Sequence, residues 1–296
     1  MPSARSKAKP KANFKLAFEA IGVPWQIEIF EPVAKPTKLE ATIRARIEDF
    51  DVAYSRFRPD SMVSRIAQRA GEYELPADAS ELFNTYRQLY DVSQGAVTPL
   101  IGQVMIDAGY DANYSLKSRP LTKPPAWDDV ISYQNPNLVV REPVWLDLGA
   151  AGKGYLVDLV GEVIETAGYR GYVIDASGDM RLRHTPQTIG LEHPDDPRLI
   201  IGQVELSNGS LCGSATNRRR WGQYHHIIDP HSLRSVQGMK ACWIYADSTI
   251  MADGLATAIF FTPVARLQTI FQFEYAYVLD DNTCIHSDDF PGMFFE

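Results

Sequence analysis

The sequence predicts an α+β fold, in which mixed or antiparallel sheets pack against helices. Stretches with strand-like alternation and stretches with helical spacing both occur, and they do not follow the regular strand–helix–strand order of a parallel α/β protein. The 296 residues are 45% apolar and 22% charged, which is ordinary for a globular protein with a substantial core. No internal repeat or low-complexity tract occurs. We therefore expect one domain over residues 14–296, after a disordered basic tail over residues 1–13.

The first half of that domain contains two predicted strands and two predicted helices. Residues 14–30 alternate as a pair of strands around a turn at Gly22-Val23-Pro24. Apolar side chains recur at helical spacing over residues 38–54 and again over residues 79–93, which predicts two helices with one buried face each. Residues 115–143 are rich in Pro and polar side chains, so we expect a loop with short strands, and covering a site is one role open to it.

The second half continues with a helix over residues 153–167, a strand over residues 172–176 and several short strands. Two more helices are predicted over residues 248–261 and 263–273. The end of the chain, YAYVLDDNTCIHS, is typical of a hairpin around Asp281-Asn282. Strands and helices mixed in this way indicate the α+β class.

The charge and the cysteines exclude several classes of protein. A formal net charge of -8 argues against general nucleic-acid binding, because phosphate backbones require clustered Lys and Arg, so a small substrate or a protein partner is expected. Cys212, Cys242 and Cys284 are widely spaced and form no CxxC pair, which favours isolated reduced thiols over a disulfide framework or a zinc ribbon. No run of about 18 apolar residues and no apolar leader occurs, so we expect no membrane insertion and a cytoplasmic location.

The stretch DLGAAGKGY, residues 147–155, combines an acidic residue, a glycine-rich turn and a lysine at the start of a helix. It is not a P-loop, because Asp147 and Gly154 stand where that motif needs Gly and Ser or Thr. Small side chains expose the backbone there, and the free N–H groups of a helix start favour an anion. An ordinary strand-to-helix turn with an exposed Lys153 is the alternative that this stretch alone leaves open.

A second turn, Ser177-Gly178-Asp179, follows the strand over residues 172–176. It can present backbone N–H groups and one carboxylate, that of Asp179, to a ligand. A Gly-Asp pair also marks ordinary hairpins, so this turn supports a site only together with other motifs.

The stretch YHHIIDPHS, residues 224–232, carries two adjacent histidines. On a strand, His225 and His226 point to opposite faces, so they cannot bind one metal together, and one of them should face the surface or a cleft. A zinc site built from His226, Asp229 and His231 lacks the ligand spacing typical of zinc. A histidine acting as a general base near neutral pH is the role that the sequence favours.

The stretch ADSTIMADGLATAIFF, residues 246–261, carries two polar side chains on one face of its predicted helix. Asp253 and Thr257, at i and i+4, project together, and small residues clear the space around them. Two hard oxygen donors one turn apart suit Mg²⁺. Local hydrogen bonding by Asp253 in the first helical turns is the other interpretation.

Taken together and in this order, these stretches resemble the FAD:protein FMN transferases of the ApbE-like family, from about residue 20 to about residue 262. The resemblance rests on seven segments, AIGVPWQIEI, YSRFRPDSMVSRI, SQGAVTPLIG, LDLGAAGKGYLVD, VIDASGDMRL, HHIIDPHS and ADGLATAIFF. It implies one domain of T-fold-like ApbE architecture. It also implies protein flavinylation, a post-translational modification in which FAD is cleaved, FMN is joined by a phosphoester to a Thr or Ser of an acceptor protein, and AMP leaves.

The resemblance implies a metal site and a phosphate site. Mg²⁺ would be held by the Ala150 carbonyl, Asp253 and Thr257, while Asp147 and Lys153 would contact FAD. Attack of a hydroxyl on phosphorus needs neutralisation of charge on the diphosphate, which Mg²⁺ and a catalytic Lys153 would supply.

The acceptor hydroxyl also needs a base, and the resemblance points to His226, which matches the family's His before the Ile-Ile-Asp-Pro run. His225 is its less favoured neighbour. The other positions predicted to bind FAD are Ile21 and Phe57, against the isoalloxazine or adenine ring, Ala96, Val97 and Thr98, along the flavin pocket, and Asp179 and Ile227.

Two departures from the family pattern leave a second function open. Thr98 stands where the family usually has a carboxylate, and Gly213-Ser214-Ala215 replaces Thr-Ser-Gly. The basic run Arg218–Arg220 that follows is either solvated or steers an acidic acceptor segment. A protein that binds FAD, or hydrolyses it to FMN and AMP without transfer, is therefore the alternative. For the transferase, we expect a cytoplasmic acceptor such as a soluble FMN-binding domain.

Overall fold

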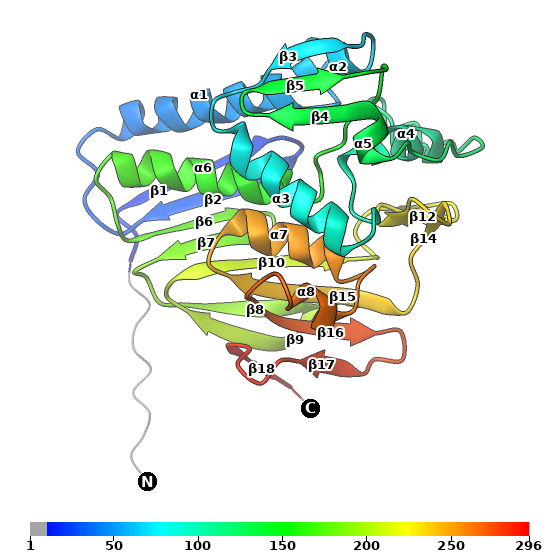
Figure 1. Ribbon diagram of the computed structural model, residues 1–296. Helices are drawn as coiled ribbons and strands as arrows, with labels where there is room; N and C mark the ends of the chain where they lie inside the picture. The colour runs from blue at the N-terminus through cyan, green and yellow to red at the C-terminus, as the bar shows by residue number, and fades with distance from the viewer. Residues whose placement is uncertain (1–10, 296) are drawn as a thin grey trace.

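The computed structural model of the protein describes residues 11–295 (Figure 1). Its centre is an eight-stranded antiparallel sheet, with helices over one face and a three-stranded sheet against the other. This arrangement confirms the predicted α+β class. The first strand begins at Phe14, the first residue of the predicted domain. Residues 1–10 of the predicted tail lie outside the described residues.

The large sheet runs in the order β1-β2-β6-β7-β10-β15-β16-β17, and all neighbouring strands pair antiparallel. Its strands are β1 (Phe14–Ala20), β2 (Val23–Ile29), β6 (Tyr172–Ala176), β7 (Asp179–Arg183), β10 (Gly209–Ala215), β15 (Met239–Ala246), β16 (Glu274–Leu279) and β17 (Cys284–His286). The hairpin predicted around Asp281-Asn282 is the one that joins β16 to β17.

The predicted hairpin at the start of the domain also forms, but its turn differs from the prediction. The turn is Ile21-Gly22, where both residues have positive φ, and Val23 and Pro24 already belong to β2. Two-residue hairpin loops of this kind need left-handed backbone, which glycine adopts without steric cost. The placement of Gly22 therefore decides where the chain reverses.

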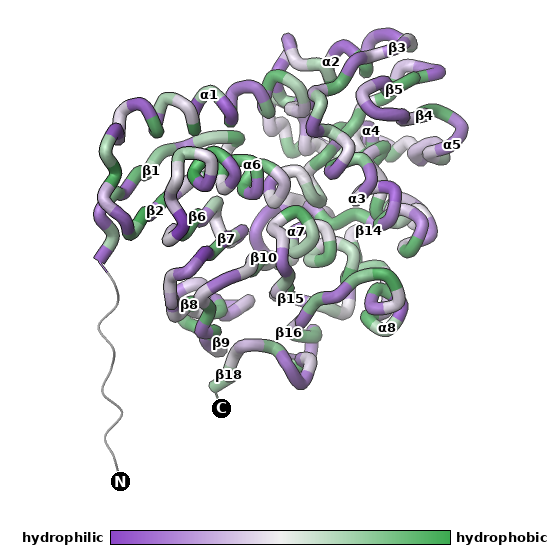
Figure 2. Tube along the Cα trace, turned by 60° about the vertical axis from the view of Figure 1, so that its left-hand side comes forward, coloured by the Kyte–Doolittle hydropathy of each residue, from purple (hydrophilic) through white to green (hydrophobic). Residues whose placement is uncertain are grey.

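Four helices lie over one face of the large sheet (Figure 1). They are α1 (Pro36–Tyr54), α3 (Ala79–Val92), α6 (Gly152–Thr166) and α7 (Thr249–Ala258), each within a few residues of a predicted helix. Along α1, hydrophilic and hydrophobic residues alternate, as expected of a helix with one buried face (Figure 2). Its buried side chains include the predicted stripe Leu39, Ile43, Ile47 and Phe50.

The opposite face of the large sheet is covered by a small antiparallel sheet in the order β18-β9-β8. Its strands are β8 (Gln187–His193), β9 (Asp196–Leu206) and β18 (Gly292–Phe294). Successive side chains of a strand point to opposite faces of the sheet, so each strand contributes to two cores. Cys242 of β15 lies in the helix-side core, and its neighbour Trp243 lies in the core between the two sheets. The middle strands of the large sheet are thus buried on both faces.

The remaining elements are short and surround this framework. They are α2 (Met62–Ile66), β3 (Gly71–Glu74), the 3-10 turn Pro99–Ile101, α4 (Gly102–Ala108), α5 (Trp127–Val130), β4 (Ile131–Gln134), β5 (Asn137–Val140), β11 (Arg220–Trp221), β12 (Tyr224–His225), β13 (Ile228–Asp229), β14 (Arg234–Ser235) and α8 (Val264–Leu267). Over residues 11–295, none of the helices has the length and hydropathy needed to cross a membrane.

Of two further predicted segments, one is shorter than expected and one forms as predicted. The helix expected over residues 263–273 is only the short α8, because the chain leaves helical geometry after Leu267 and buries Phe271 and Phe273 in the helix-side core. Residues 115–143 do form a loop with short strands, as predicted. Their strands β4 and β5 pair with each other and with β3 in a separate sheet.

Candidate active site

The two central helices, α6 and α7, approach each other closely at Gly154. A Cβ atom on this residue would lie 2.2 Å from the carbonyl oxygen of Thr249 and 2.6 Å from Cβ of Asp253. Only glycine allows this approach, and the exposed backbone N–H of Gly154 donates a hydrogen bond to Asp253 Oδ2 at 2.8 Å. The glycine-rich start of α6 therefore holds the Asp253 side chain in place.

Asp158, which the sequence places on the polar face of α6, is buried and caps the start of α7. It accepts hydrogen bonds from the backbone N–H groups of Thr249 at 3.0 Å and Ile250 at 2.8 Å, and it pairs with Arg181 of β7. Carboxylates are favoured at helix N-termini, where free N–H groups and the positive end of the dipole lie. Asp158 thus fixes the orientation of the helix that carries Asp253 and Thr257.

A buried acidic cluster lies where α6, α7 and β7 meet. Lys153 pairs with Asp179, which is 1% exposed, and its Nζ also donates to the carbonyl of Ala176 at 3.2 Å. Asp253 is 6% exposed, and burial, together with the charge of Asp179, raises its pKa well above the usual range. Burial alone would lower the pKa of Lys153, but Asp179 and Asp253 raise it, so the ammonium stays charged.

The turn before α6 is held by Arg56 and Tyr86, two side chains for which the sequence analysis predicted no role. Asp147 accepts from the N–H of Gly149 at 2.8 Å and from Arg56 Nε at 2.6 Å. The hydroxyl of the buried Tyr86 accepts from the N–H groups of Ala150, at 3.1 Å, and Ala151. Asp147 is therefore neutralised by a buried guanidinium, and the carbonyl of Ala150 has a fixed direction.

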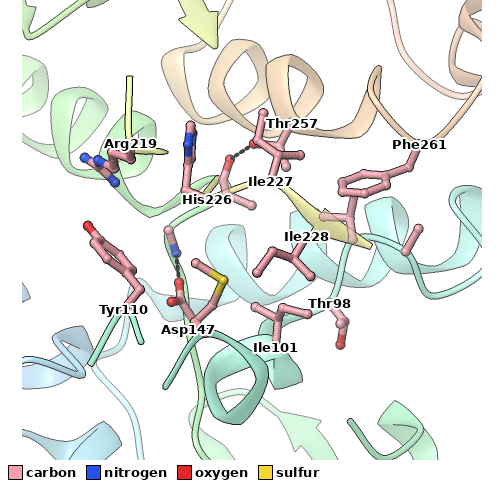
Figure 3. Close-up of a pocket in the computed structure, with 15 residues that line it drawn as sticks. Thr98, Ile101, Tyr110, Asp147, Arg219, His226, Ile227, Ile228, Thr257 and Phe261 are labelled. Carbon is pink, nitrogen blue, oxygen red and sulfur yellow. Dashed lines mark hydrogen bonds between the residues drawn. The ribbon is translucent and has the colours of Figure 1, made fainter. Parts of the chain in front are cut away.

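The three oxygens predicted to hold a metal are found close together. Thr257 Oγ1 donates to the Ala150 carbonyl at 3.5 Å (Figure 3). Asp253 lies one turn before Thr257 on α7. Hydroxyl, carbonyl and carboxylate oxygens are the donors that Mg²⁺ prefers, and the neighbouring Asp179 adds negative charge, so these residues fit the ion. Between residues 11 and 295, no group of three or more His, Cys, Asp or Glu side chains forms a metal site.

A pocket opens beside Thr257 and the turn before α6 (Figure 3). Its lining residues are Ala96, Val97, Thr98, Ile101, Met105, Tyr110, Asp147, Gly149, Ala150, Arg219, His226, Ile227, Ile228, Thr257 and Phe261. Eight of these were predicted site residues, namely Ala96, Val97, Thr98, Asp147, Ala150, His226, Ile227 and Thr257. The predicted residues Lys153, Asp179 and Asp253 lie in the adjoining acidic cluster instead of the pocket wall.

The two ends of this pocket differ in character. In Figure 3, Tyr110, Asp147, Arg219 and His226 gather on one side. Ile101, Ile228 and Phe261 lie on the other side, where apolar side chains line the wall. A ligand with a charged centre and an apolar ring system matches such a division.

The two adjacent histidines have different surroundings. His225 is buried, its Nε2 lies 3.0 Å from the carbonyl of Val236, and its Nδ1 accepts from the N–H of Ile227 at 3.3 Å. His226 lines the pocket, and its Nδ1 is buried without a hydrogen-bond partner in the described part of the chain. Burial, together with the charge of Arg219, lowers the pKa of His226 to about 3, so its imidazole is neutral.

An aromatic rim, formed by Phe57, Tyr110 and Tyr114, lies beside the polar end of the pocket. Phe57 stacks on Tyr114, with ring centroids 5.5 Å apart and an interplanar angle of 7°, and both rings meet Tyr110 edge-on. Phe57 was predicted to face a ring of FAD but is absent from the pocket wall. Ile21, predicted for the same role, sits at the tip of the β1–β2 hairpin, also outside that wall.

Several pocket residues were missed by the sequence reasoning. Ile101 and Met105 come from the 3-10 turn and α4, which were not predicted, and Tyr110 lies two residues after the end of α4. Arg219 was noticed within a basic run, and its position in the pocket wall shows that it is not simply a solvated residue. Arg56 lies in the segment YSRFRPDSMVSRI, but no role was predicted for it; it is buried and acts through Asp147.

The cysteines take no part in this site. All three are free thiols, as predicted, and Cys212 and Cys242 are buried. Burial raises the pKa of Cys242 to about 12 and holds that of Cys212 well above its usual range, so neither forms a reactive thiolate.

The fold and the site define an α+β protein of the enzyme type, with a pocket bordered by a buried acidic cluster, a lysine and a neutral histidine. A model of the ApbE family matches residues 21–278, which is most of the chain. The chain belongs to this family.

Relatives and solved structures agree with this assignment. Relatives named FAD:protein FMN transferase include those of Haemophilus influenzae, 23% identical over 274 residues (83% of this chain, 79% of the relative), and Vibrio cholerae, 23% identical over 277 residues (85% and 82%). The flavin transferase ApbE from Vibrio cholerae has a similar structure, with a TM-score of 0.80 at 21% identity, as has the ApbE protein of Thermotoga maritima, with 0.81 at 20%. Both alignments cover 93% of this chain and 97% of the other, which confirms the fold.

Proposed function

We propose that the protein is a Mg²⁺-dependent FAD:protein FMN transferase. The observation that carries the proposal is that three groups lie in or beside one pocket. They are the Thr257 hydroxyl beside the Ala150 carbonyl, the buried Lys153 cluster, and the free Nδ1 of His226. Membership of the ApbE family and the names of the relatives support the same activity.

The proposed reaction is a phosphoryl-type transfer without oxidation or reduction. The hydroxyl oxygen of an acceptor Thr or Ser attacks the phosphorus of the FMN half of FAD. A new oxygen–phosphorus bond forms, the phosphorus–oxygen bond to AMP breaks, and AMP leaves with that electron pair. The hydroxyl proton passes to a base, and FMN remains joined to the acceptor by a phosphoester.

The residues that would hold Mg²⁺ are Asp253, Thr257 and Ala150, which together offer carboxylate, hydroxyl and carbonyl oxygens. Mg²⁺, when bound, would neutralise charge on the diphosphate. Lys153 adds a fixed positive charge at the start of α6, held there by Asp179 and the Ala176 carbonyl. Charges fixed in advance in a buried site stabilise a transition state without reorganisation.

His226 is the base in this proposal, and His225 is a structural residue. His226 lines the pocket, is neutral, and has an unpartnered Nδ1 that can accept a proton. Both nitrogens of His225 are engaged by backbone groups, those of Val236 and Ile227. Of the remaining predicted contacts to FAD, Ala96 to Thr98 and Ile227 line the same pocket and would face its flavin ring.

The test is a mass measurement on an acceptor. The protein is incubated with FAD, Mg²⁺ and a cytoplasmic FMN-binding domain that carries a candidate Thr or Ser, because we propose a cytoplasmic acceptor. The acceptor should gain the mass of one FMN, and AMP should appear in equal amount. Replacing the acceptor Thr or Ser by Ala should abolish the gain.

The two other outcomes of this experiment are distinct. AMP and FMN released in the absence of any mass gain would favour the FAD-hydrolysing alternative. Bound FAD without AMP release would favour a FAD-binding protein and contradict the transferase. The Thr98 departure bears on this choice: its hydroxyl accepts from the N–H of Leu100 at 3.2 Å, so it serves local structure as well as the pocket wall.

A further inference from the structure

We propose that the exposed arginines Arg220 and Arg234 form a docking surface for an acidic segment of the acceptor protein, next to the histidine that would take the acceptor's proton. This inference rests on the proposed function, because it names the chemistry of the protein that the transferase would modify. It adds two residues that do not line the pocket and to which no role in the reaction has been given.

The short strands β11 to β14 lie in a part of the chain with a local excess of positive charge. Residues 216–238, which contain these strands, include four arginines, one aspartate and neither lysine nor glutamate. The whole chain, by contrast, has a formal net charge of -8. A basic surface on an otherwise acidic protein attracts a partner of the opposite charge and repels copies of the protein itself. The partner expected at this surface is therefore acidic.

Only part of this positive charge is free to meet a partner. Arg218 forms an ion pair with Glu192, so its charge is already compensated. Arg220 and Arg234 are exposed, and neither forms an ion pair among residues 11–295. Asp229 lies opposite Arg234 in the β13–β14 pair, but its Oδ1 accepts at 2.9 Å from a backbone N–H of the turn that follows β13. Two uncompensated guanidinium groups thus remain at the surface.

Strand geometry holds both arginines outward. Trp221, which follows Arg220 on β11, is buried, and its Nε1 donates to the carbonyl of Ala108 at 2.7 Å. Ser235, which follows Arg234 on β14, is also buried, and its hydroxyl accepts from a backbone N–H of β12 at 2.8 Å. Because successive side chains of a strand point to opposite faces, burial of these two neighbours turns the arginines toward solvent.

The two arginines lie close to His226, the proposed base. The N–H of His226 donates to the carbonyl of Arg219 at 3.1 Å, and both residues line the pocket (Figure 3). Arg220 comes next on the same strand, opposite His225, and β14 with Arg234 is hydrogen-bonded to the backbone of His225. An acceptor that brings its hydroxyl to His226 therefore passes beside this surface.

An acidic segment of the acceptor is the occupant that fits. Neither Arg220 nor Arg234 lines the pocket, so a ligand enclosed there leaves both guanidinium groups free. Guanidinium groups bind carboxylates through paired hydrogen bonds, which fix the orientation of the bound segment. Charges at the edge of an interface act mainly on the rate and orientation of association. Asp or Glu side chains near the acceptor Thr or Ser would thus guide the hydroxyl to the base.

Steady-state FMN transfer to two forms of one acceptor tests the docking surface. The first is a cytoplasmic FMN-binding domain with Asp and Glu near its target Thr or Ser, and the second has Asn and Gln in their place. With the acidic form, the double variant Arg220→Gln/Arg234→Gln should raise the KM for the acceptor about tenfold, because two charge-assisted contacts are lost. Its kcat and its calorimetric affinity for FAD should stay within about twofold of the unaltered protein. With the neutral form, the two proteins should have equal KM values.

Two control proteins separate local contact from overall charge. Arg218→Gln removes a charge from the same run, but one that Glu192 already compensates, and should leave the KM within about twofold. Arg220→Lys/Arg234→Lys keeps both charges and should retain most of the affinity for the acidic form. Added salt should raise the KM of the unaltered protein for the acidic form and change that of the Gln double variant much less.

The results that would overturn the docking surface are distinct from failure of the proposed function. An unchanged KM in the Gln double variant, an equal rise for the acidic and neutral forms, or an equal rise in Arg218→Gln would each overturn it, while transfer itself persists. If the unaltered protein transfers no FMN, the proposed function is contradicted, and calorimetric binding of the acidic form decides the surface alone. Weaker binding to the double variant would then support it, and equal binding or none to the unaltered protein would overturn it.

Discussion

Two buried ion pairs of opposite polarity join α6 to β7, and they differ in how completely they are satisfied. At the start of α6, Lys153 pairs with Asp179, and farther along the helix Asp158 pairs with Arg181. Both pairs therefore connect the same helix to the same strand. This difference indicates a structural role for the Asp158 pair and a functional role for the Lys153 pair.

The Asp158 pair is saturated. Its carboxylate accepts from Arg181 and from two N–H groups of α7, and Arg181 also donates to the hydroxyl of Tyr172 at 2.9 Å. Around Lys153, by contrast, the carboxylates of Asp179 and Asp253, with Asp175 nearby, face a single ammonium group. A saturated pair stabilises a fold, whereas a buried excess of negative charge is suited to a cation.

The largest expected effect comes from replacing Asp253 by Asn. FMN transfer should fall about 10⁴-fold, because the proposed Mg²⁺ site loses its carboxylate. The stability of the metal-free protein should not fall, since the amide can still accept from Gly154 and no longer repels Asp179. Transfer assays and urea unfolding in EDTA measure the two effects. If Asp253→Asn is inactive because it is largely unfolded, the claim that this cluster serves function and not stability is contradicted.

His226 belongs to neither pair, and near neutral pH its replacement should affect the rate alone. His226→Gln is expected to lower transfer about 10³-fold, because the acceptor hydroxyl loses its base, with FAD affinity nearly unchanged. The measurements are the transfer rate and FAD binding by calorimetry. His225→Gln should instead lower stability, because it disturbs the bonds to Val236 and Ile227. A full transfer rate in folded His226→Gln would remove this residue from the mechanism.

The same Asp-to-Asn change in the saturated pair should act on stability. Asp158→Asn leaves Arg181 buried with less compensating charge and weakens the cap of α7, so the free energy of unfolding should fall by about 3 kcal/mol. Urea unfolding in EDTA measures it. Glu162→Gln, one turn along the same helix and exposed, is the matched control and should change stability by less than about 0.5 kcal/mol. Equal effects of the two substitutions would deny Asp158 its structural role.

The smallest expected effect is a pH dependence that originates at His226. Its folded pKa of about 3 lies below the unfolded value near 6.5, so below about pH 6.5 the unfolded chain binds a proton that the folded protein does not. The contribution of His226 to stability is therefore complete above about pH 6.5 and is lost as the pH falls from about 6.5 toward 3. From about pH 7.5 to about pH 5 the loss is about 2 kcal/mol, and it should be absent in His226→Gln. Urea unfolding of both proteins at the two pH values checks the prediction.

Much of the fold could be predicted because local sequence determines it. The stripe of α1 and the turn chemistry of both hairpins depend on neighbouring residues, and these elements form where predicted, apart from the turn at Gly22. The short α8 was overestimated because the burial of Phe271 and Phe273 by distant elements outweighs helical spacing there. Periodicity also gave no indication of the short α4, although its residues line the pocket.

The site residues likewise divide into those that local sequence predicts and those that it does not. Asp253 and Thr257 could be paired from the sequence because their spacing on one helix is fixed. The role of Asp158 could not be predicted, because a helical pattern shows which face is polar but cannot show that another helix ends against it. Arg56, Tyr86 and Arg219 reach the site from segments far apart in the chain, and no local pattern records such contacts.

The most direct test of the account is a comparison of urea unfolding in Mg²⁺ plus ADP with unfolding in EDTA plus ADP. At ligand concentrations about a hundredfold above the dissociation constant, Mg²⁺ should stabilise the unaltered protein by about 2.7 kcal/mol and Asp253→Asn by almost nothing. Asp158→Asn, although less stable throughout, should show the full gain. Equal stabilisation of the unaltered protein and Asp253→Asn by Mg²⁺, or none in either, would contradict the claim that the unsaturated cluster is the metal site.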